Sequence, residues 1–494
     1  MQNGRINDFY KQFEELNKKL DKLIDENSKL SLTIYNQNLT IERLTKELEK
    51  ANKLNEKLQE ENDRLKNKNN KNSSNSSKPS STDIGKPKKS GANLYNYRTK
   101  TNNKPGGQIG HKGHNLSKEE IERKIKNKEL KEKTIYHIIK GNSKKEPLIK
   151  YKIELAIKPY VEKHIFKYDE NSNYKLPKEY KTDVTYGNSI KSLYIELGAY
   201  NVISYNRFSD FLNVITNGLI SISEGTLVNF IKEFSNKSKL SIDNLIDNIL
   251  NGVTTYTDET TSKFCEKNMY VRNYSNEETV VYKAHLNKGH EPIKEDEILT
   301  EFLGGIIGDH DTTLYSYGTK NYECNIHLGR YLEELKQNIP DTLWPFKMYE
   351  LLFRINNTRK IAKEYNLDYF SKDKIREYED EYDEIIELAK LENKKISSSF
   401  YKEKSNKLLR RLIKYKSNHL YFIKDFNVPF DNNLSERDLR IFKTKTKISG
   451  GFRSIEIAKC YVDILSIIKT SIKRNINPFD SIKDIFDNEI LFSN

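Results

Sequence analysis

The stretch GVTTYTD, residues 252–258, is rich in β-branched and aromatic side chains and ends on an acid. Such a composition predicts a β-strand. Two similar runs follow, NMYVRNY at 268–274 and TVVYKAHL at 279–286, and polar turn residues separate them. Together the three runs predict three antiparallel strands.

The order of elements after these strands indicates the fold class. Residues 293–305, IKEDEILTEFLGG, predict a helix, and GIIGDH at 305–310 predicts a fourth short strand. Charged helical patterns fill about 322–421, and AKCYVDILSIIKTSIKR at 458–474 predicts an apolar helix. This is an α/β order in which the fourth strand can return beside the first.

A heptad pattern runs without interruption through residues 13–65. One core row consists of Phe13, Leu20, Asn27, Ile34, Ile41, Leu48, Asn55 and Asn62, and the other of Leu16, Leu23, Leu30, Gln37, Leu44, Ala51, Leu58 and Leu65. Asparagine at such positions lowers stability but fixes the register of a parallel pair. Residues 1–66 therefore predict a dimerising coiled coil; the alternative is one long amphipathic helix folded back on its own protein.

Residues 67–116 are rich in Asn, Ser, Lys and Pro and almost free of apolar residues, which predicts a flexible basic linker. At its end lies KPGGQIGHKGH, residues 104–114, whose glycines would allow backbone N–H groups to approach a phosphate. Lys104 and Lys112 are candidate DNA contacts. A plain turn-rich linker is the alternative, and His111 and His114 alone would make a poor metal site.

Two further regions precede the strands. Residues 117–185 predict a small mixed α/β region, with strand-like alternation in YKIELAIKPYVEKHIFKY at 151–168. Residues 186–250 predict helices, with serines suited to N-caps. Two of these helices joined by a short turn could read DNA as a helix-turn-helix, or could simply be packed core.

Length and charge bound the function. The 494 residues are enough for two or three domains and at least one large core. The formal net charge is +14, and residues 66–114 contain eleven lysines or arginines against the single acid Asp83. This balance favours a polyanionic partner over a small neutral substrate.

Cysteine usage and hydropathy bear on the compartment. Cys265, Cys324 and Cys460 form no CxxC pair, so neither a disulfide framework nor a thiolate zinc site is indicated. The N-terminus lacks an apolar signal segment, and no run of about eighteen apolar residues appears. We expect a soluble cytoplasmic protein that is associated with the nucleoid when it binds DNA, and no membrane partner.

Acids at the ends of elements are the candidate catalytic groups. Asp258 closes the first predicted strand and Asp309 the fourth, so neighbouring strands would place both carboxylates at one edge of the sheet. Their repulsion would be relieved by Mg²⁺ or Mn²⁺, which prefer oxygen ligands. A third acid, Glu436 in PFDNNLSERDLR at 429–440, would complete a two-metal site.

These acids could instead have purely structural roles. Asn433 as N-cap and Glu436 three residues later could form a capping box that needs no metal. Asp258 could merely end its strand in a turn. Asp311 competes with Asp309 for the position of second acid.

Several ordered motifs together resemble one family, the DDE transposases of the insertion sequence 66 (TnpC) type. The resemblance covers almost the whole chain. The motifs are the N-terminal coiled coil running into NSSNSSKPSS, then KPGGQIGHKGH, SEGTL, TDET, GDHDTTLYSY, ECNIHLGRYL and VPFDNNLSERDLRIFKTKTKISGGFRS.

The resemblance implies a fold, a chemistry and a site. The fold would be similar to ribonuclease H over residues 251–494, with a helical insertion at about 322–421. The catalytic acids would be Asp258, Asp309 and Glu436, holding two Mg²⁺ (or Mn²⁺) ions. Asp258 would bridge both ions and each other acid would complete one, for in-line phosphoryl transfer without a covalent protein–DNA bond.

The resemblance also implies partners. DNA would be bound as terminal inverted repeats and as target, by a homodimer or larger assembly, with accessory proteins of the same element as further candidates. The residues expected to hold phosphates near the scissile bond follow Glu436 directly; a solvated helix face is the alternative. They are Arg437, Arg440, Lys443, Lys445, Lys447 and Arg453.

The chain departs from the family pattern in one respect. Many relatives carry cysteine pairs of zinc-finger type after the GHKGH stretch, whereas residues 115–185 contain no cysteine. We therefore expect no zinc, and we expect Cys324 and His327 to pack and hydrogen-bond on their helix. Two rival functions remain: a non-catalytic coiled-coil DNA-binding protein derived from a transposase, and a ribonuclease H-like nuclease.

Overall fold

The computed structural model describes residues 2–72, 75–76, 117–137, 146, 148–155, 157–168, 175–177, 180, 182–265 and 267–493. The chain divides into two compact units. One comprises Met1–Lys86 with Glu323–Asp431, and the other Pro87–Tyr322 with Asn432–Asn494. Lys104, Lys112, His111, His114 and the rest of the KPGGQIGHKGH motif lie outside the described residues.

A mixed five-stranded sheet organises the second unit, in the order β3-β2-β1-β4-β5. The strands are β1 (Thr254–Phe264), β2 (Lys267–Ser275), β3 (Val280–His285), β4 (Gly305–Gly308) and β5 (Lys320–Glu323). β1, β2 and β3 pair antiparallel, and β4 pairs parallel with β1. The predicted antiparallel strands and the return of the fourth strand beside the first are confirmed.

Helices on the sheet supply most of the core of this unit. α14 (Asn433–Ser449) packs on β1 and β2, and α15 (Ile455–Lys473) packs on β3 and on α5 (Glu224–Lys237). The predicted apolar helix near the end of the chain is thus confirmed as α15, which contributes fully buried Ile464, Ile467 and Ile468. Removal of these side chains from water is the main force that holds the layer together.

The helices before the sheet pack into the same core. They are α3 (Asn188–Ile195), the π-helical turn η4 (Glu196–Tyr200), α4 (Tyr205–Ile215), α5 and α6 (Lys239–Leu250). Ser223 caps α5, as expected, by accepting the Thr226 N–H at 3.2 Å. α4 and α5 are the two helices for which a helix-turn-helix was considered. α5 packs into the core through Leu227, Phe230 and Phe234, and DNA recognition by this pair stays a prediction.

Shorter helices in this unit include α7 (His290–Asp296), α8 (Ile298–Glu301) and α16 (Pro478–Phe486). The single helix predicted at 293–305 is therefore divided. The break falls at Glu297, whose φ of 59° is left-handed and ends the α7 hydrogen-bond ladder.

The predicted strand at 151–168 is not found. The described residues 151–155 and 157–168 belong to no helix or strand, although α2 (Lys118–Lys126) forms upstream. Ile153 and Tyr160 are largely exposed. Alternation stabilises a strand only where a neighbouring strand supplies hydrogen bonds and one face is covered, and the part of the chain that the structure describes supplies neither to this segment.

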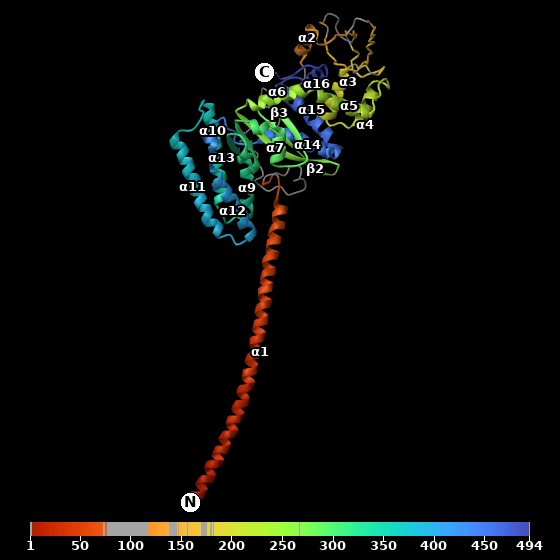
Figure 1. Ribbon diagram of the computed structural model, residues 1–494. Helices are drawn as coiled ribbons and strands as arrows, with labels where there is room; N and C mark the ends of the chain where they lie inside the picture. The colour runs from red at the N-terminus through yellow and green to blue at the C-terminus, as the bar shows by residue number, and fades with distance from the viewer. Residues whose placement is uncertain are drawn as a thin grey trace. The chain divides into compact units, whose positions relative to one another are not determined.

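The other unit is helical (Figure 1), as the charged patterns predicted. α9 (Asn325–Asn338), α10 (Trp344–Glu364), α11 (Lys372–Lys394) and α12 (Ser399–Lys414) contact one another in a ring, followed by α13 (Lys416–Leu420). Trp344 is fully buried among them and donates from Nε1 to Asn393 Oδ1 at 3.0 Å.

One continuous helix, α1 (Gln2–Asn70), contains the heptad (Figure 1). Its core rows are exposed from Phe13 to Leu58. Among the residues that the structure describes, its last turns dock: Ser398 donates to Asp63 at 2.5 Å and Asn67 to Glu334 at 3.1 Å. Pairing with a second chain stays a prediction. Within the described residues, no helix is long and apolar enough to cross a membrane.

Candidate active site

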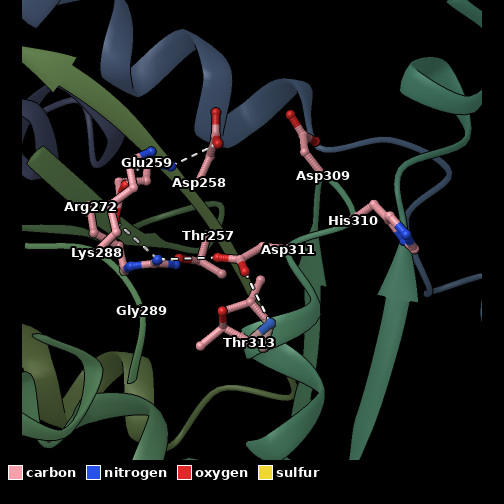
Figure 2. A pocket seen from close by; sticks show the side chains of 11 residues that line it. Thr257, Asp258, Glu259, Arg272, Lys288, Gly289, Asp309, His310, Asp311 and Thr313 are labelled. Carbon is pink, nitrogen blue, oxygen red and sulfur yellow. Dashed lines mark hydrogen bonds and ion pairs between the residues drawn. The ribbon is translucent and has the colours of Figure 1, made fainter. Parts of the chain in front are cut away.

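Asp258 and Asp309 line one cavity beside the sheet, but the expectation that Asp258 closes its strand is wrong. β1 continues to Phe264. Its pairing with β4 ends at Tyr256↔Ile307, so Asp258 lies just past the last parallel pair, and Asp309 directly follows β4. Figure 2 shows both carboxylates directed to the same side.

Asp311 is held in a different way from Asp309. Between them, His310 has a left-handed φ of 58°, and Asp311 points toward Arg272 (Figure 2). Asp311 caps the short helix η5 (Thr312–Ser316) by accepting the Thr313 N–H at 3.0 Å, and it accepts from Arg272 at 3.2 Å. Burial would raise the pKa of Asp311, but these hydrogen bonds and the Arg272 charge lower it below its ordinary value. The Asp309 carboxylate, rather than that of Asp311, therefore points to the same side as the Asp258 carboxylate (Figure 2).

The first turn of α14 is hydrogen-bonded to the same edge. Asn432, the N-cap residue, donates from Nδ2 to the Thr257 carbonyl at 2.9 Å and to Asp309 Oδ1 at 3.4 Å. Ser435 donates to Asn273 Oδ1 at 2.6 Å, and Asn273 is the cross-strand partner of Asp258. Glu436 is the next residue and is partly buried.

The capping-box alternative for Glu436 is wrong. The N-cap is Asn432 rather than Asn433, and no side chain caps the helix. The reason is tertiary: the Asn432 amide is used on Thr257 and Asp309, so it does not turn back onto its own helix. These contacts bring the first turn of α14, which carries Glu436, to the edge that carries Asp258 and Asp309.

A cavity of about 370 Å³ opens beside the two aspartates. On its wall the guanidinium of Arg272, only 3% exposed, lies 3.2 Å from Glu259 and 3.2 Å from Asp311. Lys288 approaches Glu259 at 2.8 Å. Arg272, Glu259 and Lys288 were not identified as lining residues from the sequence. The available signal was an arginine inside an apolar strand, because a buried charge needs an acidic partner.

The basic residues after Glu436 form a track on α14. Arg440, Lys443 and Lys447 follow Glu436 at spacings of four, seven and eleven residues, which places them along the same side of the helix. All three are exposed, as are Arg437 and Arg453. The track therefore leads away from Glu436.

Lys445 does not belong to that track. It is partly buried, and its Nζ lies 5.8 Å from the ring centre of Phe452 and 5.3 Å from that of Tyr461. Burial lowers its pKa. The side chain packs against aromatic rings and is poorly placed to hold a phosphate.

Cys324 and His327 lie in the helical unit and are buried. His327 Nδ1 lies 3.4 Å from the Cys324 sulfur, and Arg330 donates to His327 Nε2 at 2.9 Å. Both side chains hydrogen-bond on the face of α9, as expected from the sequence.

Two aspartates that line one cavity, beside a helix that carries a third acid and a basic track, form an arrangement suited to phosphodiester chemistry on nucleic acid. The family model described as Transposase IS66 family matches residues 184–460, more than half of the chain. The chain therefore belongs to this family, and it is a transposase that acts on DNA. A comparison with curated proteins gives no match.

Proposed function

We propose that this chain cleaves the ends of an insertion sequence and joins them to target DNA, with Asp258, Asp309 and Glu436 as the catalytic acids. The observation that carries this proposal is the pair of hydrogen bonds from Asn432 to Thr257 and Asp309. They bind the start of α14 to the sheet edge, and Glu436 lies one turn further on.

The catalytic domain would be similar to ribonuclease H and would span residues 251–494. The strand order β3-β2-β1-β4-β5, with one parallel neighbour beside three antiparallel strands, supports this assignment. The helical insertion would correspond to about 322–421, which agrees with the separation of Glu323–Asp431 as part of another compact unit.

The donor set fits hard divalent cations. Carboxylate oxygens are the ligands that Mg²⁺ and Mn²⁺ prefer, and nearby like charges are stabilised by such a cation. Asp258, Asp309 and Glu436 would hold the two ions. When bound, the ions would activate the attacking hydroxyl or water and stabilise the leaving oxygen.

The chain's own residues orient and hold the reactants. Asn432 fixes the direction of Asp309 by donating to its Oδ1. Arg437, Arg440, Lys443, Lys447 and Arg453 would hold phosphates beside the scissile bond, since all are exposed. Lys445 is withdrawn from this set because it packs on Phe452 and Tyr461.

The assembly would be a homodimer or larger, paired through the heptad rows of α1. These rows expose Leu16, Leu23, Leu30 and Leu44 at more than half of their surface, which favours association in water. Light scattering of the full chain measures this directly, and a monomer at micromolar concentration would contradict it. Terminal inverted repeats, target DNA and accessory proteins of the element are the further partners.

The test is cleavage of an oligonucleotide that carries an element end, with Mg²⁺ or Mn²⁺ as the added ion. Asp258→Asn, Asp309→Asn and Glu436→Gln should each abolish cutting and joining and leave DNA binding nearly intact. Glu456→Gln, an exposed acid on α15 paired with Lys232, is the matched control. Asp311→Asn should keep cleavage if Asp309 is the second acid.

The outcomes separate the rival functions. Binding without cutting by the wild-type chain would favour a non-catalytic DNA-binding protein. Cutting without joining, and without preference for element ends, would favour a ribonuclease H-like nuclease. Full activity in all three acid variants would refute the proposed site.

A further inference from the structure

Asn273 occupies an unusual position behind the candidate site. It lies in β2, opposite Asp258 in the antiparallel register, and its side chain is fully buried. A buried amide is costly unless its hydrogen-bonding atoms are satisfied, so its partners show what it is used for.

The partners of Asn273 lie on both sides of the site. Its Oδ1 accepts the backbone N–H of Asp258 at 3.1 Å and the hydroxyl of Ser435 at 2.6 Å. Its Nδ2 donates to Ser275 Oγ at 3.0 Å and to the Ser435 carbonyl at 3.4 Å. The two lone pairs and two N–H groups of the amide are therefore all used, and three of the four bonds join Asp258 or the residue before Glu436.

A second attachment lies one turn further along α14. Ser275 donates to Asp438 Oδ2 at 3.0 Å, and Lys473 Nζ lies 2.8 Å from the same oxygen. Ser435 and Asp438 thus fasten the inner face of α14 to β2 on either side of Glu436. Two attachments three residues apart fix the rotation of a helix about its axis, and with it the direction of the Glu436 side chain.

We propose that Asn273 is a positioning residue that sets the spacing of Asp258 and Glu436 and thereby the affinity of the site for divalent cations. The proposal rests on the function proposed above. Hydrogen-bonded groups behind metal ligands typically change metal affinity by 10- to 100-fold when they are removed. Asn273 would act in this way on two ligands at once.

The experiment compares two buried asparagines. Asn393 on α11 is also buried and hydrogen-bonded: its Oδ1 accepts from Trp344 at 3.0 Å and from Ser405 at 2.7 Å, and its Nδ2 donates to Asn406 at 3.0 Å. Asn273→Ala and Asn393→Ala should destabilise the protein to a similar degree. Only Asn273→Ala should weaken binding of Mn²⁺, by about ten-fold or more.

Mn²⁺ binding to the full chain is measured without DNA, by calorimetry or from the electron paramagnetic resonance signal of free Mn²⁺. The Mn²⁺ concentration that gives half-maximal cleavage should shift in parallel. Ser435→Ala, which removes only one hydroxyl donor, should shift both in the same direction by less, and it decides the matter if Asn273→Ala does not fold.

Each result has a distinct meaning. A wild-type chain that binds Mn²⁺ but cuts no DNA would remove the proposed activity, and weaker binding in Asn273→Ala would still support the positioning role. A chain that cuts DNA with the same Mn²⁺ affinity in the Asn273→Ala, Ser435→Ala and Asn393→Ala variants would overturn the role of Asn273 alone.

Discussion

Replacement of Arg272 by methionine should strongly destabilise the unit that contains the sheet. The guanidinium is 3% exposed and lies between two carboxylates, Glu259 at 10% exposure and Asp311 at 38%. Methionine fills a similar volume but removes the charge. The variant therefore isolates the electrostatic role of Arg272 from its packing.

The magnitude follows from what each carboxylate keeps. Removal of one partner from a buried ion pair typically costs 3–5 kcal/mol. Glu259 would retain Lys288 at 2.8 Å, and Asp311 would retain the Thr313 N–H and contact with water. The cost should therefore lie near the lower limit, about 3 kcal/mol. For a unit of this size that corresponds to a fall in melting temperature of roughly 5 °C.

Thermal unfolding followed by calorimetry, supported by urea titration, measures this loss. Arg354→Met is the matched control, because Arg354 pairs with Glu381 at 50% and 38% exposure, and such surface pairs contribute at most about 1 kcal/mol. The loss of stability in Arg272→Lys should lie between those of Arg272→Met and Arg354→Met, since an ammonium keeps the charge but lacks the planar, multidentate geometry with which the guanidinium donates to both acids. A change in Arg272→Met no larger than that in Arg354→Met would refute the reasoning.

Two further predictions concern stability. Burial raises the pKa of Asp463 above its ordinary value of 3.8, despite the opposing Ser235 hydrogen bond and the charges of Lys283 and Lys239. Because ionised Asp463 destabilises the folded state, Asp463→Asn should increase the free energy of unfolding at neutral pH, as measured by urea titration. This gain in stability should vanish as the pH falls through the raised pKa toward 3.8. An equal gain at all pH values would contradict the prediction. A Cβ on Gly305 would overlap the ring of Tyr322, so Gly305→Ala should lower the free energy of unfolding by about 1–3 kcal/mol. A Cβ on Gly187 would meet no atom within 4 Å, so Gly187→Ala should lower it by no more than about 0.5 kcal/mol. Equal losses of stability in the two variants would show that the ring can move aside.

Much of the sheet could be predicted because its strands carry their own signal. The apolar runs of β2 and β3 are buried almost continuously, on both faces of the sheet. The true end of β1 was not predictable in this way. Residues 259–264, ETTSKF, are too polar to read as a strand, and they are extended because β2 pairs with them as far as Phe264↔Lys267.

The same distinction, between residues with a local sequence signal and residues that depend on distant contacts, applies to the candidate site. Asp258, Asp309 and Glu436 could be proposed because each stands beside a recognisable strand or helix start. Arg272 was missed, since one arginine in a strand has no spacing that announces its partners. The alternative of Asn433 as N-cap fails because helix-capping rules describe local competition, and here the hydrogen bonds of Asn432 to residues distant in sequence prevail.

The place of the helical segment Glu323–Asp431 in the chain has a consequence for synthesis. The ribosome releases the sheet with Asp258 and Asp309 first, then this entire segment, and only afterwards α14 with Glu436. Since domains fold as they emerge, the proposed site lacks Glu436 while about a hundred residues are translated, at roughly 5–20 residues per second. Under the proposed assignment of the catalytic acids, the nascent chain therefore carries an incomplete site for several seconds, until nearly the whole polypeptide has been made.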